Sequence, residues 1–254
     1  MKHHFIDKYS DLNSLVHRLD PRVKILLALA GILIIVSEPP GRLLPFAFYG
    51  GVAGVLILLS RLPLGFILTR YLILSPFILL AAIFFPVSLY LSGETQAIFM
   101  HPDALKIAGS IFLKASLSII ILLWLISTEK FHNLLAGFRK LRMPRLVGVI
   151  SALMYSYIFI LWDETLKTTR ARQSRSPGKL RSNKLKVYSN QLAMIFLRSW
   201  DRSKIIHHAM LSRGFSGEFP GRKTLKIQAS DLFFMAGFLL LFLLIRLGTG
   251  IIFT

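Results

Sequence analysis

Cysteine is absent from this 254-residue chain, and acidic residues are scarce. Without cysteine there is no disulfide framework, no thiolate metal site and no catalytic thiol. Only 12 Asp and Glu residues stand against 31 Lys and Arg residues, so the formal net charge is +19, yet 54% of all residues are hydrophobic. A bilayer protein accommodates both properties when its charges lie in loops on one side, so we expect a multi-pass membrane protein.

Signatures of nucleotide and metal sites are also missing. The chain has no G-x-x-x-x-G-K-S/T loop. Leucine follows Gly178-Lys179, and in the run 221–224 (GRKT) an arginine separates the glycine from the lysine. We therefore expect no ATP bound through a P-loop, and no cofactor bound by this chain. His3 and His4 are weak candidates for a divalent metal, although a solvated pair is the commoner case. Residues 1–9 are polar, so no cleaved signal peptide is expected.

Five apolar stretches are predicted to cross the membrane. The first begins at Asp20-Pro21-Arg22, where Asp20 suits a helix N-cap and Pro21 the first helical position, and it should end near Ser37. Because this span is short, we expect Arg22 and Lys24 to reach the interface. The other spans are 43–60; 71–91, after a loop at 61–70; 107–126, in which Lys114 should reach the interface or pair with a neighbouring helix; and 232–245, extending toward the C-terminus.

The apolar stretch 147–162 has the hydropathy of a sixth span, but the charge around it argues otherwise. Residues 127–228 contain 20 Lys and Arg against 5 Asp and Glu, a balance of +15. The positive-inside rule places both flanks in the cytoplasm. We therefore predict that 147–162 is a helix packed against other helices, with the N-terminus inside and the C-terminus outside. A six-span arrangement, with most of the positive charge outside, is the alternative.

The fold class is thus expected to be all-α and polytopic, in three parts: membrane helices in 1–126, a cytoplasmic helical module in 127–228 and a last membrane helix in 229–254. Within the module, Ser127 or Thr128 should cap a helix over 129–141, and Pro144 should start a second helix ending near 170–173. A basic linker over 179–186 should lead to a third helix over 189–213. Asp163 and Glu164 precede Lys167 at spacings that allow ion pairs on one helix.

Two tripeptides are predicted to mark the ends of the second and third module helices. They are Ala171-Arg172-Gln173 and Ser212-Arg213-Gly214. Gly214 suits a left-handed C-terminal cap. A helix-terminal arginine can simply satisfy the last carbonyls and the helix dipole, and the basic module can simply face anionic lipid. Two such arginines on a membrane protein without a nucleotide site nevertheless favour coupling to a soluble partner.

Several segments together resemble the T component of energy-coupling factor (ECF) transporters, most closely the cobalt-type CbiQ branch. The resemblance covers nearly the whole chain, in order, and rests on 17–24 (HRLDPRVK), 141–146 (LRMPRL), Met154-Tyr155, Asp163-Glu164 and 209–219 (AMLSRGFSGEF).

This resemblance implies a non-catalytic scaffold in the inner (cytoplasmic) membrane of a prokaryote, surrounded by lipid. Its implied partners are two ABC-type ATPases, which would bind ATP and Mg, and a small membrane S component that binds cobalt or nickel. In the family, helices ending in Ala-Arg-Gly-like tripeptides dock on the ATPases. The resemblance assigns that role to Arg172 and Arg213, with Ala171, Gln173, Ser212 and Gly214 beside them. Gln173 stands where glycine is usual, and Ser212 where alanine is usual.

Three other interpretations remain open from the sequence. A T component for a vitamin would share the same pattern, because the selective site lies on another chain. A polytopic membrane enzyme would need clustered His, Asp or Glu near the membrane surface. A nucleic-acid binder would add base-stacking side chains to the positive charge, and only Tyr188 and Trp200 offer that here, so no nucleic-acid partner is expected.

Overall fold

The computed structural model describes Ser14 and residues 16–39, 44–91, 102–175, 184–217 and 228–252, and these residues form helices without any strand. A 3₁₀ turn (Val16–Arg18) precedes the α-helices. The α-helices are α1 (Pro21–Val36), α2 (Leu44–Leu59), α3 (Leu64–Leu91), α4 (Pro102–Thr128), α5 (Phe131–Lys140), α6 (Arg145–Arg175), α7 (Lys184–Ser212) and α8 (Ala229–Ile252). The chain is therefore all-helical, as the sequence predicts.

The helices divide into two compact units. The bundle unit comprises His4–Gly137 and Thr224–Thr254, and the helix-pair unit comprises Met1–His3 and Phe138–Lys223. The sequence-based boundaries at 127 and 228 differ from this division because most of α5 packs within the bundle unit. The location of either unit inside or outside the membrane stays a prediction.

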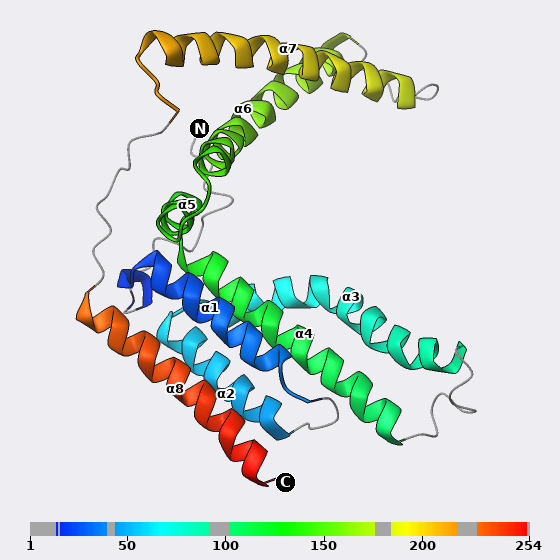
Figure 1. Cartoon of the computed structure of the whole chain (residues 1–254). Coiled ribbons are helices and arrows are strands. Elements are labelled where there is room, and N and C mark those ends of the chain that lie inside the picture. The colour runs from blue at the N-terminus through cyan, green and yellow to red at the C-terminus, as the bar shows by residue number, and fades with distance from the viewer. Residues whose placement is uncertain are drawn as a thin grey trace. The chain divides into compact units, whose positions relative to one another are not determined.

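In the bundle unit, α1 and α4 are the central helices. Helix α1 packs against α4 and α8, while α4 also packs against α2 and α3 (Figure 1). The side chains that fill the core are almost fully buried and include Leu27, Ile35, Leu56, Ile121, Trp124 and Phe242. At Gly31 a β-carbon would lie 3.5 Å from Phe242 and 3.6 Å from Ile121, so the small residue lets three helices meet closely.

Helix α1 matches its predicted bounds and cap. The Asp20 side chain accepts a hydrogen bond of 2.9 Å from the Arg22 backbone N–H, and Pro21 occupies the first turn. At the other end, Lys114 Nζ of α4 donates to the carbonyls of Val36 (3.1 Å) and Glu38 (2.5 Å). Lys114 therefore pairs with a neighbouring helix, one of the two outcomes expected for it, and satisfies carbonyls that the helix end leaves open.

Two sequence-based boundaries are wrong. The loop expected over 61–70 is shorter, because α3 already begins at Leu64. The expected linker over 179–186 ends earlier, because α7 begins at Lys184, and lysine is a good helix former. Residues 179–183 lie outside the described residues.

The cap expected for α5 is also wrong. Thr128 is the last residue of α4, and its hydroxyl donates back to the carbonyl of Trp124 at 2.9 Å. A hydroxyl occupied in its own helix does not cap the next one. Helix α5 starts instead at Phe131, where the Lys130 carbonyl accepts from the backbone N–H groups of Asn133 and Leu134.

The surface of the bundle unit suits hydrocarbon rather than water. Large apolar side chains are exposed on α3 and α8, among them Phe77 (75%), Leu80 (67%) and Phe233 (78%). Contiguous apolar surface of this kind is costly in water and natural in lipid. Together with the all-helical architecture, it identifies a polytopic membrane protein.

Four helices of the described part of the chain are long and apolar enough to cross a membrane. They are Leu64–Phe84, Lys106–Thr128, Arg145–Arg175 and Ala229–Gly248, and Leu44–Leu59 is a shorter apolar helix. The third of these is α6, which contains the stretch 147–162. By length and composition α6 qualifies as a span, whereas the charge of its flanks argues against crossing. The five-span arrangement therefore stays a prediction.

Candidate functional site

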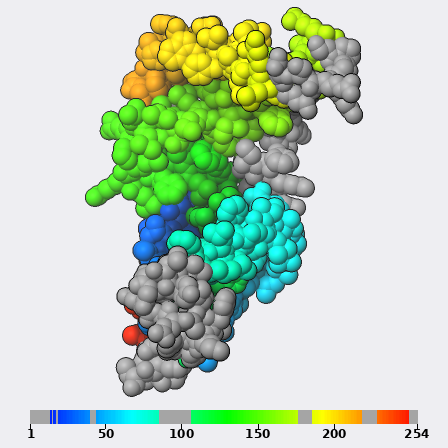
Figure 2. Space-filling view, turned by 90° about the vertical axis from the view of Figure 1, so that its right-hand side faces the viewer, coloured from blue at the N-terminus to red at the C-terminus, as the bar shows by residue number. Residues whose placement is uncertain are grey.

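Helices α6 and α7 form an antiparallel pair that carries both tripeptides. Figure 2 shows the yellow surface of α7 against the green surface of α6. Three contacts follow one another along the pair, three to seven residues apart on each helix. Glu164 Oε1 accepts from Arg198 Nη1 at 2.6 Å, Thr169 Oγ1 accepts from Gln191 Nε2 at 2.8 Å, and the Arg172 guanidinium carbon lies 5.3 Å from the ring centroid of Tyr188.

These cross-links revise the role expected for one acidic residue. The sequence pattern suggested that Glu164 pairs with Lys167 on its own helix, whereas its short ion pair joins α6 to Arg198 on α7. Sequence spacing reveals contacts within a helix and not the register between two helices. Helices α6 and α7 are therefore connected at several levels, and we call such a connected pair braced.

The first tripeptide lies inside the last turn of α6 rather than at its end. Ala171, Arg172 and Gln173 are helical, and the helix continues to Arg175. Ala171 and Gln173 are exposed, whereas Arg172 is half-buried beside Tyr188. Within the described part of the chain, the Arg172 Nε atom is buried without a hydrogen-bond partner. The ring of Tyr188 thus holds the Arg172 side chain at the exposed end of the pair.

The second tripeptide closes α7 as the sequence predicts. Ser212 is the last helical residue, and Gly214 has a φ of +75°, in the left-handed region that glycine adopts without steric cost. The Phe215 N–H donates to the Met210 carbonyl at 3.0 Å, and the Gly214 N–H to the Leu211 carbonyl at 3.0 Å. This pair of bonds is a Schellman motif, which fixes the chain direction just after the helix. Arg213 sits in that turn and is exposed.

The two arginines lie at opposite ends of the pair. Arg172 contacts Tyr188 near the start of α7, and Arg213 follows the last residue of the same helix. With a rise of ~1.5 Å per residue, the 25 positions from Tyr188 to Arg213 span roughly 38 Å. The two arginines are therefore too far apart for one small domain to contact both.

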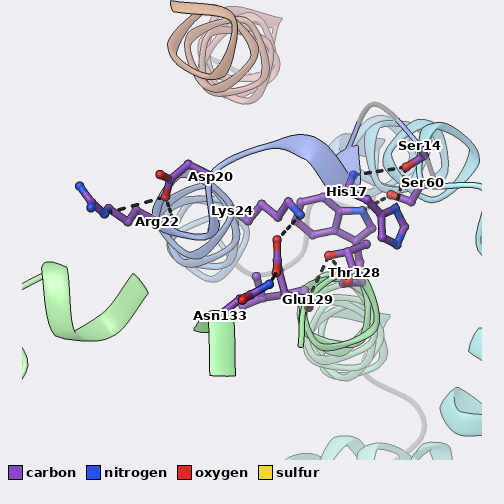
Figure 3. Close-up of polar contacts among 11 residues, drawn as sticks. Ser14, His17, Asp20, Arg22, Lys24, Ser60, Thr128, Glu129 and Asn133 are labelled. Atoms are coloured by element: carbon purple, nitrogen blue, oxygen red, sulfur yellow. Dashed lines mark hydrogen bonds and ion pairs between the residues drawn. The ribbon is translucent and has the colours of Figure 1, made fainter. Parts of the chain in front are cut away.

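The Asp20-Pro21-Arg22 motif belongs to a different, buried polar site in the bundle unit (Figure 3). Next to it, Lys24 Nζ of α1 donates to Glu129 Oε1 at 2.6 Å, and Asn133 Nδ2 of α5 donates to Glu129 Oε2 at 3.0 Å. We call these three residues the Lys24 cluster. The Lys24 side chain is 0% exposed, so the expectation that it reaches the membrane interface is wrong.

The described residues contain no recognisable metal site. No group of three or more His, Asp or Glu residues there is arranged to hold a metal ion. The weak metal candidates His3 and His4 lie outside the described residues. The adjacent His207 and His208 of α7 have ring centroids 6.0 Å apart.

Known proteins resemble this chain along most of its length. A model of the cobalt transport protein family CbiQ matches residues 12–225, a range that includes both tripeptides. The protein MJ1571 of Methanocaldococcus jannaschii, described as uncharacterized, is 24% identical over 241 residues, covering 91% of this chain and 82% of that protein. The energy-coupling factor transporter transmembrane protein EcfT of Bacillus selenitireducens is 28% identical over 230 residues, covering 84% of each. The cobalt transport protein CbiQ of Rhodobacter capsulatus is 26% identical over 178 residues, covering 70% of this chain and 64% of that protein.

Proposed function

The chain belongs to the CbiQ family of cobalt transport proteins, and we propose that it is the transmembrane scaffold, or T component, of an ECF-type importer. In this role it couples ATP hydrolysis by two ABC-type ATPases to a membrane S component that binds the substrate. The observation that carries the proposal is the α6–α7 pair, which presents Arg172 and Arg213 at opposite ends of a braced element.

Arginine suits a docking tip for physical reasons. Its planar guanidinium stays charged and donates several hydrogen bonds in a fixed geometry to carboxylates or carbonyls of a partner. The Schellman turn fixes the backbone beside Arg213, whose side chain is exposed, and Tyr188 lies against Arg172. When the two ATPases close on ATP, each would displace the tip that it holds, and the cross-links between α6 and α7 would make the pair move together.

In this proposal the chain is not an enzyme and binds no cofactor itself. ATP and Mg belong to the ATPase partners. The transported substrate is cobalt or nickel, bound by the S component. The name of the Rhodobacter capsulatus relative supports cobalt. The resemblance to EcfT proteins keeps a vitamin as the alternative substrate, because the selective site would lie on the S component.

The proposed location is the cytoplasmic membrane of a prokaryote, with the N-terminus and the helix-pair unit in the cytoplasm and the C-terminus outside. The balance of +15 over residues 127–228 supports this orientation through the positive-inside rule. In this proposed orientation, both arginines would lie on the side where ATPases and ATP are found.

A pull-down from native membranes in mild detergent tests the proposal. We expect the tagged wild-type chain to bring down two ATPase subunits and a small membrane protein, and the Arg172→Glu/Arg213→Glu variant to lose the ATPases. Arg202→Glu, an exposed charge reversal in the middle of α7, is the matched control and should keep them. Recovery of the chain alone from wild-type membranes would refute the scaffold role.

A further inference from the structure

The Lys24 cluster joins three parts of the bundle unit at one buried point. Lys24 is in the first turn of α1, Glu129 lies in the two-residue link between α4 and α5, and Asn133 is in the first turn of α5. The Lys24 and Glu129 side chains are 0% and 5% exposed. Both carboxylate oxygens of Glu129 are used, one by the ammonium of Lys24 and one by the amide of Asn133. The link between α4 and α5 is thereby fixed to α1 (Figure 3).

A second contact holds α5 against α1 one turn further along. At Gly137 a β-carbon would lie 2.9 Å from Ile25 Cδ1, 3.4 Å from Pro21 Cβ and 3.5 Å from the Arg22 backbone nitrogen. The backbone of α5 therefore rests directly on the first turn of α1, an approach that only glycine permits without displacement. Since Asn133 and Gly137 are one helical turn apart, α5 is attached at two levels and cannot pivot about a single contact.

The far end of α5 is also held in a defined geometry. Arg142 adopts a φ of +70°, and the Met143 N–H donates to the Phe138 carbonyl at 3.2 Å, so that α5 ends in a hydrogen-bonded left-handed turn. At Gly148, in the first turn of α6, a β-carbon would lie 3.1 Å from the Arg139 side chain. The last residues of α5 thus meet the start of α6 through a close contact and a fixed turn.

Stability alone does not account for a buried ion pair at this position. Taking two charges out of water offsets most of their attraction, and apolar residues of the same size often stabilise a protein equally well. What the pair adds is a defined position for the groups that it joins. Here those groups are the central helix of the bundle unit and the base of the helix that leads into α6 and α7.

From these contacts we infer that α5 is a rigid lever whose base, held by the Lys24 cluster and Gly137, transmits movement of the α6–α7 pair to α1. Lys24 and Glu129 are positioning residues in this inference, and the joint between α5 and α1 stays closed throughout the cycle. The inference rests on the proposed scaffold function and specifies where movement of the cytoplasmic helices enters the membrane bundle.

The first test measures substrate uptake per ATP hydrolysed by the complete complex in proteoliposomes, with Co²⁺ as the substrate probe. We expect Lys24→Met and Glu129→Gln to lower this ratio at least about fivefold while ATP hydrolysis continues, as typical for loss of coupling between two sites. Lys114→Met is the matched control, because it removes a lysine that bonds the opposite end of α1. It should leave the ratio unchanged. Fewer surviving complexes with an unchanged ratio in the Lys24 and Glu129 variants would show a purely structural role and overturn the inference.

The second test locks the joint covalently. The chain has no cysteine, and the 3.4 Å between Pro21 Cβ and a β-carbon at residue 137 is close to the spacing in a disulfide. Ile25 Cδ1 is the free end of a side chain and can move to admit the new sulfur. In the Pro21→Cys/Gly137→Cys variant, we expect the oxidised complex to keep the uptake per ATP of its reduced form. In the Lys24→Met background, oxidation should restore much of the lost coupling.

Oxidation that abolishes uptake, with recovery on reduction, would mean that the joint must open and would overturn the inference. Wild-type complexes treated in parallel control for cysteines of the partner subunits. If the wild-type chain assembled with no ATPase and supported no uptake, the proposed function itself would fail. Failure of the inference alone gives a different result: the wild-type complex transports substrate, and oxidation abolishes uptake by the variant.

Discussion

The bundle unit and the helix-pair unit each contain a short ion pair, and the two pairs have the same length but differ in exposure. The Lys24–Glu129 pair of the bundle unit and the Arg198–Glu164 pair of the helix-pair unit each have an N–O distance of 2.6 Å. The first has side-chain exposures of 0% and 5%, the second 55% and 20%. Water screens the exposed pair and can replace either partner, whereas burial keeps water away from the Lys24–Glu129 pair. The same N–O distance therefore belongs to a fixed contact in the bundle unit and to a contact that water can replace in the helix-pair unit.

The largest effect should follow from breaking the buried pair on one side only. Glu129→Ala removes the carboxylate that the buried Lys24 ammonium bonds directly, and breaking a buried pair in this way costs about 3–5 kcal/mol. Thermal unfolding of the purified chain in detergent should show a clear loss of stability. The double variant Lys24→Met/Glu129→Leu should recover most of it, because neither charge then remains. A double variant as unstable as Glu129→Ala would mean that the pair stabilises the bundle by more than its charges.

The close approach at Gly137 should give the next largest effect. Gly137→Val forces side-chain atoms into the space of Ile25 and the backbone of Arg22, and overpacking of this kind costs about 1–3 kcal/mol. Gly54→Val is the matched control, because a β-carbon there has no neighbour within 4 Å. The same unfolding measurement should separate the two variants. Equal effects would show that α5 yields easily at this contact.

A smaller effect is expected at the turn after α7. Gly214→Ala places a β-carbon on a backbone with a φ of +75°, which costs roughly 1–2 kcal/mol locally. Hydrogen exchange of the Phe215 amide should speed up, since its bond to the Met210 carbonyl depends on this turn. Gly214→Asn should have a milder effect because asparagine tolerates the left-handed region. Unchanged exchange in Gly214→Ala would argue against the Schellman turn.

The smallest effect should come from the exposed pair. Arg198→Ala is expected to change the free energy of unfolding by less than about 1 kcal/mol, as for other solvent-exposed ion pairs. Thermal unfolding at low and high salt measures it, and the difference should shrink further at high salt. A loss as large as that of Glu129→Ala would remove the contrast between the two units.

Local signals in the sequence predicted much of the fold. Asp20-Pro21 gives the cap and the start of α1, and Gly214 gives the end of α7 through a backbone conformation that few other residues adopt. Apolar composition located α2, α4 and α8 to within a few residues at most ends. These features depend on neighbours within one or two turns, which is the range over which residue type acts directly.

The features that sequence missed depend on residues far apart in the chain. Lys24 and Glu129 are separated by 105 positions, and no spacing rule links them. The same applies to Glu164, which could have met Lys167 on its own helix and bonds Arg198 of α7 instead. Gly137 gave no local signal, since a glycine within a helix reveals its purpose only through what lies against it. For the Lys24–Glu129 pair, the sequence offered one hint, which is an acidic residue directly after an apolar span.

The measurement that bears most directly on the account is ATP-driven Co²⁺ uptake by the reconstituted complex carrying Arg213→Glu. Losing one partner of a docked charge pair costs about 2 kcal/mol or more, so uptake and ATPase binding should fall at least about tenfold. Arg202→Glu, the same charge reversal on the middle of α7, should keep both near wild type. Uptake and assembly that survive Arg213→Glu would contradict the proposal that the tip of α7 docks an ATPase.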